Sequence, residues 1–330
     1  MSALIDPSSL DLWTRARPRL PWLTEWLTEE VWTQTRFQES GGSPFEYLKS
    51  GERLVNAQES LFTAAADSYL AELVATPSLP RTLSDFFQEH SDGAAVILDG
   101  CSLREIPAIV ELARQSRRSV LERSCGRSAI PSTTEHFVRD RMGFGLPTMA
   151  PSQLASRKEW KERGIRFHYF QDPSESQSIG DHAGPIILWH RFPDLRFMDS
   201  TASRAEFYDS IWDTLELVWQ RTVQALPPSR TVLVTSDHGY VFLGAGLIDQ
   251  NLDGADRPLK GKRYREFPQD EPLPPESLGL FVDHRRRLAV IRGRCHNRPQ
   301  APSPSKSLYR HEGLSLMEVL TPWLVLGPVE

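Results

Sequence analysis

An aspartate and a histidine stand directly after an apolar segment in the sequence TVLVTSDHGYV, residues 231–241. The leading residues have the β-branched composition of a strand, so Asp237 and His238 are expected where that strand ends. A strand of a parallel α/β sheet is buried along its length, and ligands bind outside its carboxyl end. Because carboxylate and imidazole groups both bind divalent cations such as zinc, this segment predicts a metal site.

A second segment of the same kind, AAVILDGCS at residues 94–102, ends its apolar run at Asp99. Two strands that end in acidic residues and lie far apart in the chain predict one metal centre assembled from both. Each motif has a simpler alternative. The Asp99-Gly100 pair favours a turn, because Asp and Gly are common turn residues, and the Asp237-His238-Gly239 segment would also suit a turn at a strand end.

Length and composition place the chain among ordinary globular proteins. Its 330 residues correspond to one large domain or two smaller ones, and 25% of them are charged while 39% are hydrophobic. The mean hydropathy is −0.40. No apolar run approaches the ~18 residues of a membrane span, and the N-terminal sequence lacks the apolar core of a signal peptide. We therefore expect a cytoplasmic location and no membrane contact.

Cysteine usage and charge narrow the function classes further. The three cysteines, Cys101, Cys125 and Cys295, have no C-x-x-C spacing, which indicates a reducing compartment without a disulfide framework or a cysteine zinc site. The net charge is −5 and the pI is about 6.0, so the chain is not a polycation. Two basic clusters, KGKRYR at 260–265 and RRR at 285–287, are expected to be solvated, and the alternative is contact with phosphate or nucleic acid near an active-site mouth.

The chain is expected to have two parts. Residues 1–90 predict a helical N-terminal extension, because apolar residues recur at helical spacing, and it would pack on the core or dock a partner. From about residue 93, strands and helices alternate, which is typical of a mostly parallel sheet with helices on both faces. We therefore predict an α/β unit over residues 91–330, in which residues 250–308 form an insertion or lid and a hairpin.

The pattern also predicts the individual elements of this unit. Strands are expected at 94–99, 119–124, 185–192 and 231–237 and at the end of the chain, and helices at 103–116, 132–143, 153–164 and 203–226. Residues 250–277 are more typical of a lid than of a sheet, whereas LGLFVDH and RLAVIRG are typical of a hairpin. The Pro- and Ser-rich segment 297–307 is expected to be mobile, and a short helix is expected from about Ser315.

In this order, the motifs resemble those of the alkaline-phosphatase superfamily and, within it, the PglZ domain. VILDG, with Asp99, is similar to the first metal-binding strand, and TSDHGYV matches the S-D-H-G metal motif. IPSTTEHF resembles the P-T-x-T segment of the phosphodiesterase branch, which would place the nucleophile at Thr134. RHEGLSLMEVLTP resembles the closing R-H-G-G-x-S-x-x-E motif and would supply His311. The resemblance covers roughly residues 93–330.

The resemblance implies an alkaline-phosphatase-like core that binds two divalent ions, zinc or alternatively manganese, about 4 Å apart across a phosphoryl group. Asp99, Asp237 and His238 would bind one ion, which would activate the Thr134 hydroxyl for attack on phosphorus and formation of a covalent phospho-enzyme. The other ion would activate the hydrolytic water. His311 would bind this second ion together with an Asp and a His at D-x-x-x-H spacing.

That last ligand pair departs from the family pattern. Asp194 stands at the expected position after the strand at 185–192, but Met198 stands where the histidine is expected, and Asp199 follows it. A thioether is a poor zinc ligand in this setting. Either Asp199 replaces the histidine, or the second site is weakened or empty. His190 would contribute only in a different register.

Two other candidates have structural alternatives. Thr134 would also suit the N-cap of its helix, where a nucleophile would gain from the helix dipole as well. A lone histidine such as His311 is more often a surface residue, and its position before GLSL favours the functional interpretation.

The sequence therefore predicts a metal-dependent phosphodiesterase with Thr134 as nucleophile, acting on a phosphodiester such as a nucleotide or nucleic acid. The PglZ resemblance implies a bacterial setting, often a phage-defence system of the BREX type. The alternative is a catalytically degenerate scaffold that keeps one metal and docks other defence proteins through residues 1–90. Met198, which stands in place of a ligand, favours this alternative. A third hypothesis, a phosphomutase of the same superfamily, is disfavoured by the short chain and the RHEGLS segment.

Overall fold

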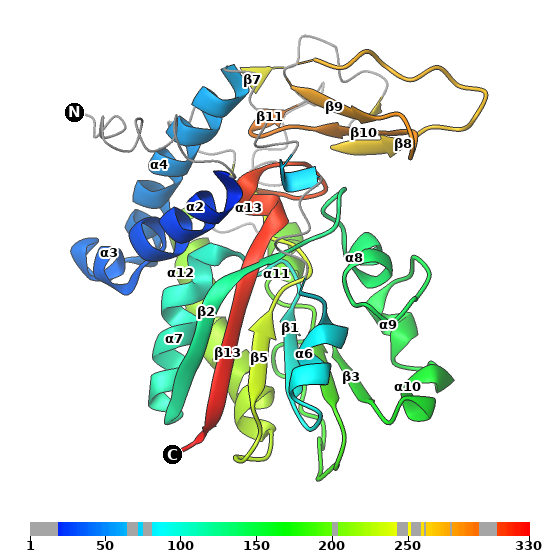
Figure 1. Ribbon diagram of the computed structural model, residues 1–330. Coiled ribbons are helices and arrows are strands. Elements are labelled where there is room, and N and C mark those ends of the chain that lie inside the picture. The colour runs from blue at the N-terminus through cyan, green and yellow to red at the C-terminus, as the bar shows by residue number, and fades with distance from the viewer. Residues whose placement is uncertain are drawn as a thin grey trace.

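The centre of the fold is a six-stranded sheet (Figure 1). The computed structural model describes residues 19–64, 72–74, 81–199, 204–242, 250–251, 259–260, 262–277, 279–296 and 309–330. In spatial order the strands are β2 (Arg118–Arg127), β13 (Leu320–Val329), β5 (Val232–Thr235), β1 (Ala94–Leu98), β4 (Ile186–His190) and β3 (Arg166–Phe170).

The sheet is mostly parallel, as predicted. β5, β1, β4 and β3 are parallel to one another, whereas β13 runs antiparallel to both of its neighbours, β5 and β2. The four strands expected within the chain and the one at its end are all present. Five of the six strands therefore point the same way, and their carboxyl ends meet at one edge.

Helices cover both faces of this sheet (Figure 1). The helices of the two faces are α7 (Ile106–Gln115) and α12 (Arg204–Arg221) on one, and α6 (Leu83–Glu89), α8 (Thr134–Asp140), α9 (Pro151–Leu154) and α10 (Lys158–Glu162) on the other. The alternation of side chains along a strand explains the two layers. In β1, Val96 belongs to the core of the first face and Ile97 to that of the second.

The N-terminal helices contribute to the core of the first face. They are α2 (Arg19–Trp26), a π-helical turn (Leu27–Val31), α3 (Gln34–Glu39) and α4 (Pro44–Ala64). Leu27, Trp32 and Tyr47 are fully buried, and they belong to the same apolar cluster as Val96 of β1. The helical character expected for this part of the chain is confirmed, and its described residues pack directly on the α/β core.

A smaller three-stranded sheet lies above the carboxyl edge in Figure 1, and it consists of β8 (Tyr264–Glu266), β10 (Leu288–Ile291) and β9 (Leu280–Asp283). β9 and β10 form the predicted hairpin. The expectation that residues 250–277 form no sheet element is wrong for β7 (Gln250–Asn251), which pairs with β11 (Cys295–His296), and for the tripeptide β8, which pairs with β10. The tripeptide is too short to show strand alternation in the sequence.

The remaining elements are short. They are α11 (Asp194–Asp199), α13 (Leu316–Val319), the pair β6 (Val241–Phe242) and β12 (Tyr309–Arg310), and the pair β7 (Gln250–Asn251) and β11 (Cys295–His296). The helix expected from Ser315 is confirmed, with Ser315 as its N-cap. The segment 297–307 lies outside the described residues. In the described part of the chain, we find no helix with the length and apolarity that crossing a bilayer requires.

Two element predictions need correction. The single helix expected at 153–164 is two short helices, because Arg157 adopts an extended conformation (ψ 132°) between them. β3 was not predicted. Its residues, RFHYF, carry charge and are only partly buried at four of five positions, as suits an edge strand, so they lack the continuous apolar run of the central strands.

A buried ionic network joins α4 to the core. Arg104, which is fully buried, donates from Nε to Glu52 Oε1 at 2.6 Å and from Nη1 to the Tyr240 carbonyl at 2.9 Å. Arg294 donates to the other Glu52 oxygen. Burial alone disfavours a charged guanidinium, but Glu52 raises the pKa of Arg104 above its ordinary value. Glu52 therefore pairs with two buried arginines, and Glu59 lies 3.8 Å from Arg294 as a second partner.

Removal of that carboxylate is expected to be strongly destabilising. Glu52→Gln leaves the buried Arg104 charge without its partner and removes one of the two carboxylates that pair with Arg294, which costs about 3–5 kcal/mol. The matched control is Glu46→Gln on the same helix, since Glu46 forms an exposed pair with Lys49 worth less than about 1 kcal/mol. Urea unfolding of both variants measures the difference. Equal effects of the two substitutions would show that the network does not stabilise the fold.

Candidate metal centre

The predicted ligands follow three neighbouring strands of the central sheet. Asp99 comes directly after β1, Asp237 and His238 follow β5, and Asp194 begins α11 after β4. The strand order β5-β1-β4 places these three parallel strands side by side. Because the strands point the same way, their carboxyl ends bring residues from distant parts of the chain to one edge.

Asp99, Asp237 and His238 form the first donor group. One ligand atom from each lies within 4.8 Å of the others. His238 Nε2 is 3.6 Å from Asp99 Oδ1 and 3.6 Å from Asp237 Oδ2. All three side chains are buried, with at most 6% of each residue exposed.

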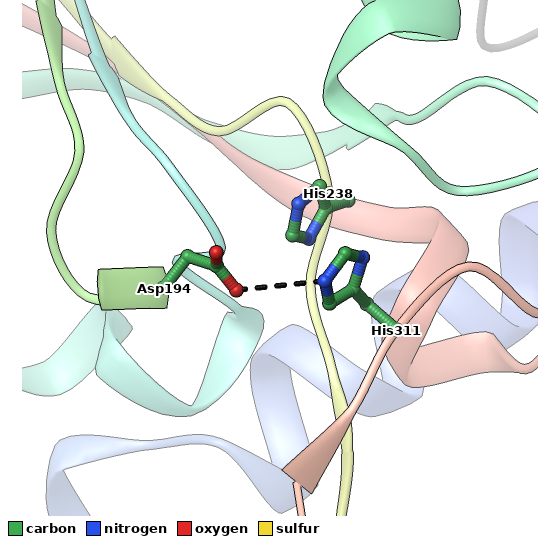
Figure 2. A group of neighbouring side chains, drawn as sticks. All are labelled: Asp194, His238 and His311. Atoms are coloured by element: carbon green, nitrogen blue, oxygen red, sulfur yellow. Dashed lines mark ion pairs between the residues drawn. The ribbon is translucent and has the colours of Figure 1, made fainter. Parts of the chain in front are cut away.

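Asp194, His238 and His311 form the second donor group, again with ligand atoms within 4.8 Å of one another. His311 Nε2 lies 3.6 Å from Asp194 Oδ1, as the dashed line in Figure 2 marks. The rings of His238 and His311 are stacked, with centroids 4.2 Å apart and planes 7° apart. His238 therefore lies between the two groups and is a member of both.

Both imidazoles are oriented by main-chain carbonyls. His238 Nδ1 lies 2.9 Å from the Gly239 oxygen, and His311 Nδ1 lies 3.4 Å from the Ser132 oxygen. A ring that donates from Nδ1 keeps its Nε2 lone pair for a cation, which is the usual arrangement of metal-binding histidines. In each case the Nε2 atom faces the carboxylates.

The electrostatics of the first group fit a divalent cation. Burial raises the pKa of Asp99 well above its ordinary value, and the Asp237 and Asp194 carboxylates raise it further. Burial lowers the pKa of His238, but Asp237 and Asp194 outweigh burial and raise it overall. Asp99 Oδ1 and His238 Nε2 are buried without a hydrogen-bond partner among the described residues. Two carboxylates and an imidazole are a donor set that zinc or manganese accepts.

Thr134 places a hydroxyl against the first group. It is the first residue of α8, and its Oγ1 donates a hydrogen bond to Asp237 Oδ2 at 2.6 Å. The alternative in which Thr134 caps its helix is wrong by one residue, because Thr133 is the N-cap and its hydroxyl accepts from the His136 amide. The Thr134 side chain is therefore not used for capping.

Contacts between strand ends fix the first group. Ser236 Oγ donates to the Leu98 carbonyl at 2.6 Å, and the Gly100 amide donates to Asp237 Oδ1 at 3.1 Å. Gly100 has a positive φ of 75°, and a Cβ there would lie 3.1 Å from Asp194 Cβ. The Asp99-Gly100 turn foreseen from the sequence is therefore present, and it positions Asp99 beside the other ligands.

A second buried ion pair supports His311. Arg263 donates from Nε and Nη2 to the two oxygens of Glu318, each at 2.9 Å, and Glu318 Oε1 also accepts from the Gly313 amide. The Gly239 amide donates to the Glu318 carbonyl. Neither residue was singled out from the sequence for this role, although Glu318 is the last residue of the RHEGLSLME segment and Arg263 lies in the KGKRYR cluster.

Some sequence candidates are not placed in the site. The side chains of Met198 and Asp199 lie outside the described residues, so the replacement of the missing histidine by Asp199 stays a prediction. His190 belongs to neither donor group, and its Nδ1 accepts a hydrogen bond from the Phe192 amide at 2.9 Å. Burial lowers the pKa of His190 to about 4.

No protein-family model matches the chain, and a search of curated proteins gave no match. Among solved structures, it is similar to phosphonoacetate hydrolase from Sinorhizobium meliloti bound to phosphonoacetate, with 12% identity, coverage of 72% of this chain and 90% of that chain, and a TM-score of 0.42. It is also similar to an inactive murine ectonucleotide pyrophosphatase/phosphodiesterase 5 bound to AMP, with 13% identity, coverage of 71% and 87%, and a TM-score of 0.43. At this identity the similarities assign no activity to this chain, so the site is interpreted from its own residues.

The clustered carboxylates predict a stability that depends on metal. In chelator-treated protein at pH 7, Asp99→Asn is expected to raise the thermal midpoint, because burial and Asp237 raise the pKa of Asp99 above its value in the unfolded chain and this carboxyl therefore destabilises the fold at that pH. Zinc or manganese at a hundredfold excess over its Kd is expected to stabilise the native chain by about 2.7 kcal/mol and Asp99→Asn far less. Thermal unfolding with and without metal measures both effects. An equal response of the two proteins would exclude Asp99 as a ligand.

His190 predicts a pH dependence of stability. Its pKa is about 4 in the folded chain against an ordinary 6.5, so the unfolded chain takes up a proton first as the pH falls. The contribution of His190 to the free energy of unfolding is complete above pH 6.5 and is lost as the pH falls towards 4. Between pH 7 and 5 the loss from this residue is about 2 kcal/mol. His190→Asn keeps an acceptor for Phe192, so urea unfolding should show a smaller loss in this variant, and an identical loss would contradict the prediction.

Proposed function

We propose that this chain is a metal-dependent phosphodiesterase with Thr134 as its nucleophile. One observation supports this above all. The Thr134 hydroxyl is not needed for helix capping, and it donates a hydrogen bond at 2.6 Å to Asp237, which is a member of the buried first donor group. A second donor group adjoins the first through His238. Two adjoining cation sites beside a nucleophile suit phosphoryl transfer.

Asp99, Asp237 and His238 would hold one cation, and Asp194 and His311 would hold the other, with Asp199 as a proposed replacement for the missing histidine. When bound, zinc or manganese would stabilise the negative charge that develops on the attacking and leaving oxygens. Asp237 Oδ2 orients the Thr134 hydroxyl. Attack of its oxygen on phosphorus would break one ester bond and release that alcohol, to which the Thr134 proton passes, and would leave the phosphate with its remaining ester group on Thr134. Water would then cleave this bond, which would release a phosphate monoester and restore the hydroxyl.

The resemblance of the motifs to the PglZ domain supports the finer parts of this proposal. The similarity of IPSTTEHF to the P-T-x-T segment of the phosphodiesterase branch favours a diester, such as a nucleotide or nucleic acid, over a monoester or sulfate ester. The PglZ resemblance supports a role in bacterial phage defence of the BREX type. A cytoplasmic location and the docking of defence proteins through residues 1–90 belong to the same proposal.

A second candidate function is favoured by Met198. α11 begins at Asp194, so a ligand one helical turn later would stand at position 198, where the sequence has a thioether. A chain with only the first cation site would act as a scaffold that keeps one structural metal. Bound-metal analysis separates the candidates, because the enzyme requires about two ions per chain and the scaffold one or none.

Hydrolysis of bis-p-nitrophenyl phosphate with zinc or manganese tests the proposal. Thr134→Val keeps the shape of the side chain but removes the hydroxyl, and it is expected to reduce kcat by about a thousandfold or more. Thr134→Ser should retain activity, because a hydroxyl remains. Thr133→Ser is the matched control, since it preserves the cap of α8 and leaves Thr134 in place.

Each outcome assigns the protein to one candidate. Activity in the native chain that is lost in Thr134→Val and kept in both serine variants supports the phosphodiesterase. Native activity that survives in Thr134→Val would exclude Thr134 as the nucleophile. A folded, metal-loaded native chain without activity would favour the scaffold.

A further inference from the structure

Arginines gather around a cavity beside the Thr134 segment. The cavity has a volume of about 510 Å³, and four arginines and two aspartates are among its lining residues: Arg127, Arg141, Arg285, Arg286, Asp140 and Asp283. Arg285 and Arg286 belong to the turn between β9 and β10, which is the RRR cluster of the sequence. A chain with a net charge of −5 thus concentrates positive charge at one place.

The two aspartates offset the charge of these four arginines only in part. Asp140 is paired with Arg139 at 2.6 Å, and Asp283 is paired with Arg286 at 3.1 Å. Burial lowers the pKa of Arg127 to about 10, and the neighbouring Arg141 and Arg286 charges contribute to the decrease. An arginine keeps its proton in a protein, so the charges of Arg127, Arg141 and Arg286 repel one another, and a bound anion would offset this repulsion.

Arg285 has the freedom to contact such an anion. It is exposed, and among the described residues no hydrogen bond or ion pair engages its side chain. Arg286 lies closer to the chain, because its Nη2 donates to the Ile130 carbonyl. The cavity therefore combines three arginines whose side chains donate to main-chain carbonyls with Arg285, which makes no such contact among the described residues.

The cavity is connected to the nucleophile by the chain itself. Ile130 lines it and also lines an adjoining hollow of about 380 Å³, which His136 lines as well. His136 Nδ1 lies 2.7 Å from Thr133 Oγ1. Residues 130–134 thus connect the lining of the arginine cavity to Thr134 along the chain.

We propose that this arginine cavity binds a phosphate group of the substrate other than the one that Thr134 attacks. Guanidinium groups match phosphate oxygens in charge and geometry. The substrate class is then a compound with at least two phosphates, either a nucleic acid strand or a nucleoside polyphosphate. This inference rests on the proposed function for the identity of the reacting group, but binding at the cavity is measurable without turnover.

The test uses the full chain with Thr134→Val, so that hydrolysis does not interfere. Binding of a fluorescein-labelled decathymidylate and of a labelled ATP analogue is measured by fluorescence anisotropy between 50 and 200 mM salt. Adding Arg285→Gln to this protein is expected to weaken binding of the probe that resembles the substrate severalfold. For a single strand, the slope of log binding constant against log salt concentration is expected to decrease by about 0.7. The matched control is Arg114→Gln on α7, where Arg114 is exposed and pairs with Glu111.

Weaker binding of decathymidylate alone identifies a nucleic acid strand, and weaker binding of the ATP analogue alone identifies a nucleoside polyphosphate. Affinities unchanged by Arg285→Gln, or reduced equally by Arg114→Gln, would overturn the inference, as would no binding of either probe by the parent. These results are independent of the bis-p-nitrophenyl phosphate assay, so the failure of one proposal is distinguishable from the failure of the other.

Discussion

The structure is organised around one electrostatic constraint: three carboxylates, those of Asp99, Asp194 and Asp237, lie together at the edge where three parallel strands end. Burial and mutual repulsion both oppose this arrangement, and the raised pKa of Asp99 reflects them. In the described part of the chain, the ion pairs of these carboxylates come from His238 and His311, not from lysine or arginine. An imidazole releases its proton when a cation binds, whereas a guanidinium keeps its charge and would stay beside the carboxylates. This edge of the sheet is therefore suited to bind a metal ion with release of the imidazole protons.

The buried arginines lie behind the site instead. Arg104 is bonded to the carbonyl of Tyr240, two residues after His238, and Arg263 is bonded to Glu318, which accepts from the amide two residues after His311. Each pair thus fixes the main chain close to a histidine of the proposed metal centre, and neither arginine pairs with the clustered carboxylates. Ligands whose backbone is held in this way need little rearrangement on binding. This arrangement requires buried charges to be paired across the chain. Arg104 depends on Glu52 of α4, and Glu318 depends on Arg263, which directly precedes β8.

The sequence was sufficient for the parts of the site that depend on strand periodicity. The apolar runs before Asp99 and Asp237 predicted both strands and the edge where their acidic residues meet, because a buried parallel strand must be apolar up to its carboxyl end.

The ion pair of Glu52 with Arg104 could not be predicted, since an ion pair between distant residues leaves no local pattern. β3 was missed for another reason: the charged and partly buried positions of this edge strand interrupt the continuous apolar run that marks a central strand. The resemblance placed Thr134, but only the structure shows that Thr133 caps the helix and leaves the Thr134 hydroxyl to Asp237.

On the proposed function, the opposite charges of the two sites have a mechanistic consequence. A phosphodiester is an anion, so the carboxylate edge repels it until cations are bound, and metal binding must precede productive substrate binding there. The arginine cavity carries the opposite charge and needs no metal to attract phosphate. A substrate with a second phosphate would therefore be retained at the cavity while its scissile group enters the metal edge, and residues 130–134 would set the separation between the two. A simple diester lacks this second contact and depends on the metal edge alone, so the KM for a polyphosphorylated substrate should be lower and more sensitive to salt.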